Sequence, residues 1–183
     1  MKNFKLILII IACANIFAAC KKEKTDPTEL SKLPAATQTG AKTFGCLVNG
    51  VAFVPQSNCT FLCSPPLQFG YDNSNGGQFF VEVSNDNLKQ KIIWGIDSCN
   101  IVKKYNYYPS PNHPVRLSFR PNDNVCVLST VIDPEVATST NGYINIEKFD
   151  ISNGIISGTF EFTLSKNGCE TKKITNGRFD AKL

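Results

Sequence analysis

Eight cysteines carry the most reactive side chains of this chain, and their spacing favours disulfides over catalysis or metal binding. Cys13 and Cys20 lie in an apolar leader. The other six cysteines are an even number, and in an exported chain this predicts up to three disulfides, whose pairing the sequence leaves open. These cysteines are Cys46, Cys59, Cys63, Cys99, Cys126 and Cys169. A zinc site is the alternative, but Cys59 and Cys63 have no second close pair and His113 is the one histidine, so we expect neither a metal nor another cofactor.

Catalytic motifs are missing from the sequence. No serine lies in a G-x-S-x-G turn and no H-E-x-x-H segment occurs. His113 has no recognisable nucleophile near it in the chain, so it is not expected to be a general base. The paired carboxylates of a glycosidase meet in space without local spacing, which leaves a hydrolase as the less favoured alternative. The sequence therefore favours a protein that is not an enzyme.

Cys20 is the predicted lipidation site. Residues 1–19 have the form of a lipoprotein signal peptide, with Lys2 and Lys5 before an apolar run and Phe17-Ala18-Ala19 directly before the cysteine. The apolar run is too short to span about 30 Å of hydrocarbon, which argues against a transmembrane helix. We therefore expect an exported protein, held by its lipid in the cell envelope. The outer membrane is favoured, at its periplasmic face or at the cell surface.

The residues after Cys20 divide into a tether and a domain. Residues 20–42 are polar, contain Pro27 and Pro34, and show no sustained apolar period, which predicts a flexible tether. Residues 43–183 are long enough for one domain with its own core. From Gly40 onward the chain has 13 Lys and Arg against 12 Asp and Glu, so this part is nearly neutral and most of the overall charge of +4 belongs to the leader and the tether. Without a basic patch, nucleic acid is not an expected partner.

Three tyrosines form the candidate ligand surface. Tyr105, Tyr107 and Tyr108 lie in a stretch that also holds three prolines. A tyrosine ring stacks on the apolar face of a sugar while its hydroxyl forms hydrogen bonds, so exposed tyrosines would indicate a glycan or peptide site. The alternative is a strand on which Tyr105 and Tyr107 alternate inward, with a structural role only.

The elements that position these residues are about ten predicted strands separated by turns. This pattern predicts an all-β fold, either an antiparallel β-sandwich or a barrel. Phe and Tyr number 13 and 5 against one Met, a composition that favours strands. Asn49-Gly50 between two apolar runs predicts a hairpin, and Trp94 is expected in the core. Further strands are expected at residues 67–71, 78–84, 91–97, 115–119 and 125–132, and three times within residues 142–183, where alternation is clearest at 156–164.

Two sets of motifs lie at the two ends of the domain. The first is LPAATQTGAKTFGCLVNGVAFVP near the start. The second is GYINIEKFD, IISGTFEF and ITNGRFDAKL at the end. Together these motifs resemble a family of uncharacterised lipoproteins from Bacteroidota. The resemblance covers the first hairpin and the last three strands, and it implies an envelope location and a β architecture but no catalytic residue. Within these motifs Arg178 and Asp180 are expected to be structural, and a site formed with Asp150 is the alternative.

The functional expectation is a binding module on the cell envelope. Its ligand would be a glycan or a peptide, or the domain would be an accessory subunit of a larger envelope complex. The alternative is a structural or assembly lipoprotein that binds only protein. Exposed tyrosines at 105, 107 and 108 would favour the glycan site, and a long unpaired strand edge or a large apolar patch would favour assembly.

Overall fold

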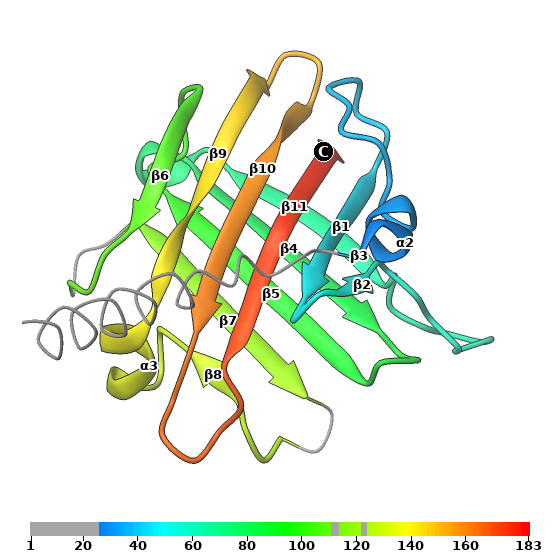
Figure 1. Ribbon diagram of the computed structural model, residues 1–183. Helices are drawn as coiled ribbons and strands as arrows, with labels where there is room; N and C mark the ends of the chain where they lie inside the picture. The colour runs from blue at the N-terminus through cyan, green and yellow to red at the C-terminus, as the bar shows by residue number, and fades with distance from the viewer. Residues whose placement is uncertain (1–25, 111–113, 122–123) are drawn as a thin grey trace, which may run out of the picture.

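Two antiparallel sheets pack face to face in a β-sandwich (Figure 1). The structure is a computed structural model and describes residues 26–110, 114–121 and 124–183. Cys20 and His113 therefore lie outside the described residues. The predicted all-β antiparallel fold is confirmed, and because the two sheets do not close on each other the sandwich is the correct form and the barrel is not. No helix among the described residues is long and apolar enough to cross a membrane.

Sheet A is the six-stranded sheet at the front of Figure 1. Its centre is formed by the last three strands, which the alternating pattern of residues 142–183 predicts. The first hairpin joins one side, and Asn49 and Gly50 at its turn both have positive φ, as this tight turn requires. In spatial order the strands are β2 (Val51–Phe53), β1 (Thr43–Val48), β11 (Lys172–Lys182), β10 (Ile155–Leu164), β9 (Asn141–Asp150) and β6 (Lys103–Tyr107).

Sheet B is the five-stranded sheet behind it. Its strands are β3 (Leu67–Asp72), β4 (Gln78–Asn85), β5 (Gln90–Asp97), β7 (Val115–Pro121) and β8 (Leu128–Ser129). The strand expected at residues 125–132 is mostly wrong, because only β8 pairs with β7. Cys126 is bonded to Cys169, and Asp133 caps the helix α3 (Pro134–Ser139), so the chain leaves the sheet on both sides of β8. The turn η1 (Ser74–Gly76) joins β3 to β4.

Aromatic side chains fill the space between the sheets. Trp94 of β5 is 1% exposed, as expected for a core residue, and contacts rings from both sheets. Its centroid lies 5.7 Å from Phe79 of sheet B and 5.0 and 5.5 Å from Phe179 and Phe160 of sheet A. Such edge-to-face and tilted pairs are each worth about 0.5–1.5 kcal/mol beyond the burial of their area. The core therefore fixes which residues of each strand face inward.

Residues 26–42 pack on the outer face of sheet A, which corrects the predicted tether over this range. Helix α2 (Pro27–Ser31) begins at the N-cap Asp26, and Glu29 Oε2 accepts a hydrogen bond of 2.8 Å from the backbone N–H of Ala52. Leu33 is buried, and Arg178 Nη1 donates to the carbonyl of Pro34 at 3.3 Å. The packed unit thus includes residues 26–42.

A buried carboxylate holds the end of this segment. Asp180 of β11 is 0% exposed and accepts five hydrogen bonds from residues 37–41, three of them from backbone N–H groups. Burial raises the pKa of Asp180, but the hydrogen bonds together lower it by more, so its pKa lies below the ordinary value. The contacts of Asp180 and Arg178 therefore support the structural role expected of them, and the alternative site with Asp150 stays a prediction.

Two disulfides are present among the described residues. Cys126–Cys169 joins the loop before β8 in sheet B to the turn between β10 and β11 in sheet A, across 43 residues of chain. A crosslink over that length is worth about 4 kcal/mol in the chain-entropy model. Cys59–Cys63 lies in the loop between β2 and β3 and joins two cysteines that are only four positions apart in the chain. The first disulfide therefore ties the sheets together and the second shapes a local loop.

Replacing Asp180 with Asn is expected to lower the free energy of unfolding by about 2–3 kcal/mol at pH 7, because the Asn amide presents a donor to N–H groups that need an acceptor. Since the pKa of Asp180 is lowered in the folded state, its stabilisation is complete above the unfolded-state pKa of about 3.9 and is lost as the pH falls through the lower folded-state value. The difference between the two proteins should therefore shrink below about pH 4.

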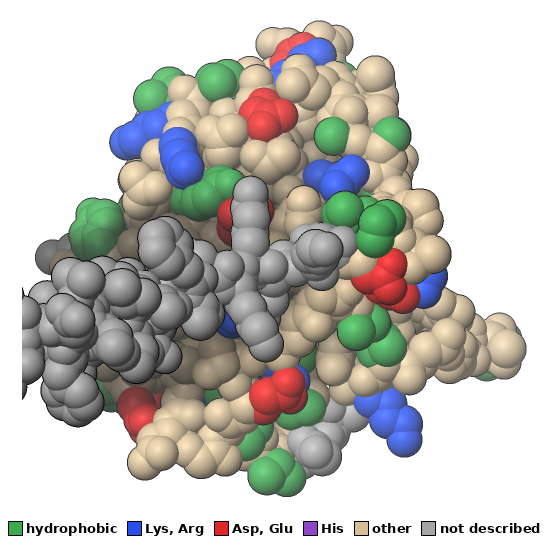
Figure 2. All heavy atoms as spheres, in the orientation of Figure 1, with side chains coloured by type: hydrophobic (Ala, Val, Ile, Leu, Met, Phe, Trp, Pro, Cys, Tyr) green, Lys and Arg blue, Asp and Glu red, His purple; other side chains and the backbone are tan. Residues whose placement is uncertain are grey.

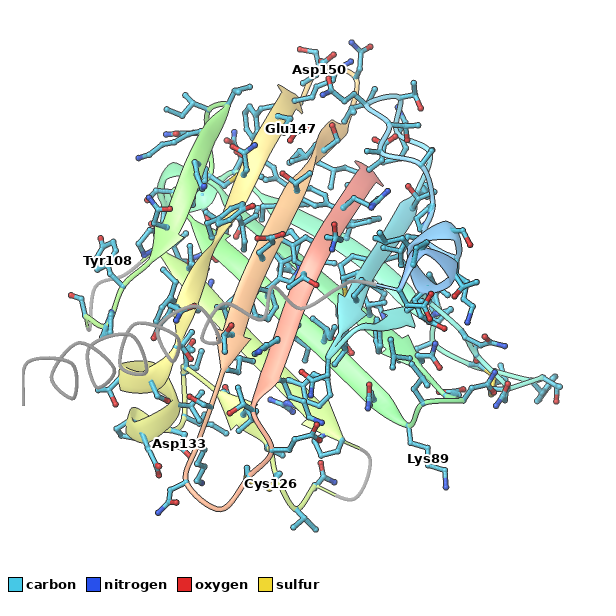
Figure 3. All side chains as sticks on the ribbon, viewed as in Figure 1. Lys89, Tyr108, Cys126, Asp133, Glu147 and Asp150 are labelled. Carbon is cyan, nitrogen blue, oxygen red and sulfur yellow. A yellow bond between two sulfur atoms is a disulfide. The ribbon has the colours of Figure 1, made fainter. Side chains whose placement is uncertain are left out.

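Denaturant unfolding of both proteins at pH 7 and pH 3 measures this effect. Asp150→Asn is the matched control, because Asp150 is the last residue of β9 (Figure 3), is only partly buried, and has as partners Asn153 and, at 4.0 Å, Lys148 Nζ. It should cost less than Asp180→Asn at pH 7. An equal cost for the two variants would show that Asp180 does not clamp residues 37–41.

Candidate binding groove on the outer face of sheet B

Two of the three predicted ligand tyrosines are buried, so the predicted tyrosine surface is wrong. Tyr105 and Tyr107 are 4% and 6% exposed because β6 alternates and turns both inward. The Tyr105 hydroxyl donates to the carbonyl of Ile101 at 3.3 Å, and that of Tyr107 to the carbonyl of Ala137 at 2.9 Å. Burial raises the pKa of both phenols. Tyr108 alone is exposed, at the margin of the molecule (Figure 3).

Cys46 and Cys99 are free thiols, which corrects their expected part in a third disulfide. Cys46 lies in β1 and Cys99 lies two residues after the end of β5, and both are fully buried. Burial raises the pKa of Cys46 far above its usual range and raises that of Cys99 to about 12. Neither thiol ionises at neutral pH, so they pack as small apolar side chains and are not nucleophiles. Among the described residues, no three His, Cys, Asp or Glu side chains are grouped to hold a metal ion.

Two adjoining hollows lie on the outside of sheet B and share three lining residues, Arg116, Val131 and Ile132. The larger, of about 590 Å³, extends from these residues to α3 and to the connection between β6 and β7. The smaller, of about 370 Å³, lies on the sheet itself and reaches Phe80 and Ile93. Together they form one surface, which we call the sheet B groove.

The pleat of the strands produces the sheet B groove. Phe80, Gly95 and Arg116 lie opposite one another on β4, β5 and β7, so their side chains share the outer face. The Phe80 ring leans over β3, where a Cβ on Gly70 would lie 2.1 Å from its Cε1 atom. Glycine at position 95 leaves a low floor between the Phe80 and Arg116 side chains. Ile93 and Ser118 form the next row across the same strands.

Apolar side chains are unusually exposed in the sheet B groove. Phe80 is 47% exposed, Val131 62% and Ile132 68%. Single exposed apolar residues are ordinary on protein surfaces, but here all three border the smaller hollow, and Val131 and Ile132 border the larger one as well. Water contact with these groups is unfavourable by about 25 cal/mol per Å², so a ligand that covers them gains free energy.

Charged side chains of both signs line the sheet B groove: Arg116 and Arg120 line the smaller hollow, and Asp97 and Asp133 line the larger one. Arg116 Nη2 lies 2.5 Å from Asp97 Oδ1, and both side chains are more than a third exposed. Exposed ion pairs contribute only about 0–1 kcal/mol, so Arg116 is open to exchange its partner for an anionic ligand group. Arg120 donates to the Ser118 hydroxyl at 3.4 Å, close to the same hollow. The face can therefore bind an anionic group beside an apolar one.

The sequence held one signal for this groove. In β4 the residues Phe79, Phe80 and Val81 are all apolar, so Phe80 breaks the alternation of a half-buried strand and places an aromatic ring outside. Arg116 has no distinguishing spacing, and Val131 and Ile132 fall in the stretch expected to be a strand. The groove depends on strand neighbours that are far apart in the chain.

The chain matches no protein-family model, no curated protein and no solved structure. The sheet B groove must therefore be interpreted from its own geometry.

The two buried thiols give a direct test of the cysteine assignment. With iodoacetamide and no reductant, the folded protein should show no label at Cys46 or Cys99, because both are shielded and protonated. After denaturation without reductant, peptide mass mapping should find label at both of these cysteines and none at Cys59, Cys63, Cys126 or Cys169. Unlabelled Cys46 and Cys99 in the denatured chain would mean that they are disulfide-bonded.

Proposed function

We propose that this protein is an envelope-anchored lipoprotein whose β-sandwich is a binding module, and that the sheet B groove is its ligand site. The proposed anchor is a lipid on Cys20, which would place the domain at a membrane surface, with the outer membrane favoured. The observation that carries the proposal is the exposure of Phe80, Val131 and Ile132 around Arg116, on one continuous surface.

A peptide fits the sheet B groove better than a glycan does. Sugar sites rely on planar aromatic rings that stack on the ligand. Two of the three tyrosine rings expected to do so, those of Tyr105 and Tyr107, are buried. Arginine is suited to carboxylates because its planar guanidinium forms two parallel hydrogen bonds with them. The proposed ligand is therefore a peptide or protein segment with an acidic side chain near an aromatic or aliphatic one.

An assembly role is the second candidate, and one observation favours it. β3 is an edge strand of sheet B, six residues long, with Asp72 as its one charged residue. An edge with few charges is a template for strand pairing with another chain. The sheet B groove remains the preferred site because it combines apolar exposure with charged groups that fix orientation.

Selection from a displayed library of random peptides, using the full lipidated chain in nanodiscs, tests the peptide proposal. The selected peptides should carry Asp or Glu near an aromatic or aliphatic residue. Phe80→Ser and Arg116→Ala should each weaken their binding by about tenfold or more, because each removes an anchor worth at least about 1.4 kcal/mol. Binding should also weaken with added salt, since Arg116 is partly exposed.

Lys89→Ala is the matched control for loss of charge, because Lys89 is exposed on the turn between β4 and β5 (Figure 3) and lines neither hollow of the groove. It should leave the affinity within about twofold, as is usual for an uninvolved surface residue. Selected peptides whose affinity is unchanged by both Phe80→Ser and Arg116→Ala would refute the sheet B groove as their site.

A further inference from the structure

Residues 56–66 form a loop between β2 and β3 that projects beyond both sheets (Figure 1). At its tip, Phe61 is 80% exposed and Leu62 is 90% exposed. The disulfide Cys59–Cys63 closes the loop around these two residues. The loop therefore presents two large apolar side chains on a projection. We call residues 56–66 the apolar tip.

The apolar tip is held in place at its base as well as by its disulfide. The backbone N–H of Asn58 donates to Asp86 Oδ2 at 2.8 Å, and the Asn58 side chain donates to Asn87 Oδ1 at 2.9 Å. Leu62 has φ of 52°, in the left-handed region that leucine rarely adopts. A backbone held in such a conformation is typical of functional sites. The tip is thus preorganised to present its apolar residues.

Charge separates the apolar tip from the rest of the molecule. Residues 51–71 contain no Asp, Glu, Lys or Arg, in a chain in which 19% of residues are charged. In Figure 2 the projecting loop shows neither red nor blue side chains, whereas both colours are scattered over the body of the domain. An uncharged projection enters the apolar edge of a bilayer without leaving a charge in hydrocarbon.

The predicted anchor brings a bilayer close to the apolar tip. Because residues 26–42 pack on the domain, only five residues separate Cys20 from Asp26, which limits their distance to about 20 Å in any conformation. Helix α2, which follows, bonds to β2 through Glu29 and Ala52, and β2 leads directly into the tip. Lys89 is exposed on the same side (Figure 3), where it can face anionic lipid.

We propose that the apolar tip inserts Phe61 and Leu62 into the interface of the bilayer that holds the lipid on Cys20. This inference rests on the lipid anchor of the proposed function. Anchor and tip together would fix the orientation of the domain as well as its distance from the membrane. The tip adjoins the Leu67 end of β3, whereas the sheet B groove runs from Phe80 of β4 past β8 to α3, which lies on the other side of the domain from the tip (Figure 1). A docked domain therefore turns its groove away from the bilayer.

Fluorescence quenching in vesicles tests the insertion. The full lipidated chain carrying Phe61→Trp is reconstituted in vesicles of neutral and anionic phospholipid that contain brominated acyl chains. The new indole should emit at shorter wavelength and be quenched, whereas Trp94 is buried in the core and gives a constant background measured in the parent chain. Adding Leu62→Asn should lower the inserted population by about tenfold, because it removes one apolar side chain while Asn tolerates the positive φ.

Val125→Trp is the positional control. Val125 is also 80% exposed and also adjoins a disulfide cysteine, Cys126, which lies at another end of the molecule (Figure 3). Its indole should stay unquenched. Protein that floats with the vesicles while the Phe61→Trp indole stays unquenched would refute the insertion and leave the anchor intact, and would turn attention to a protein partner for the tip. Protein that does not float with the vesicles would refute both.

Discussion

The contact of Trp94 with the rings of Phe79, Phe160 and Phe179 is the constraint on which the rest of the domain depends. These rings come from both sheets, so they fix the register of each strand as well as the distance between the layers. A shift of one residue in the register of β4 would turn Phe80 inward and Phe79 outward, and it would move all the remaining side chains of that strand to the opposite face of the sheet. The sheet B groove is thus a consequence of core packing, because the residues that line it are those the core leaves outside.

The outer faces of the two sheets differ in how far the rest of the chain covers them. Sheet A is covered in part by residues 26–42, which Asp180 binds through backbone and side-chain hydrogen bonds. This covering joins the TQTGAK and NGRFDAKL segments, which are more than a hundred residues apart, so their residues are explained by mutual contact. Sheet B keeps exposed apolar side chains beside arginines on its outer face. The difference favours sheet B as the side that meets a ligand.

The local pattern of the sequence predicts most of the strands but not their partners. Alternation at residues 156–164 predicts β10, and the Asn49-Gly50 pair predicts the turn between β1 and β2. Both depend on residues that are close together in the chain, and both are confirmed. Contacts between residues far apart in the chain are not predicted in this way. Examples are the hydrogen bond of Tyr107 to α3 and the hydrogen bonds that Asp180 accepts from residues 37–41. Two of the six cysteines stay free for the same reason, because Cys46 and Cys99 are buried in the core and their spacing in the chain does not reveal this.

The central claim is that the sheet B groove contacts a ligand in the envelope. Photocrosslinking tests it most directly, with benzoylphenylalanine in place of Phe80 in intact cells and the same residue in place of Ile151, which is 39% exposed on the turn after β9, as the control. The account predicts a discrete crosslinked protein or peptide at position 80, lost when Arg116→Ala is added, and none at position 151. Equal crosslinking at both positions, or none at position 80, would contradict it.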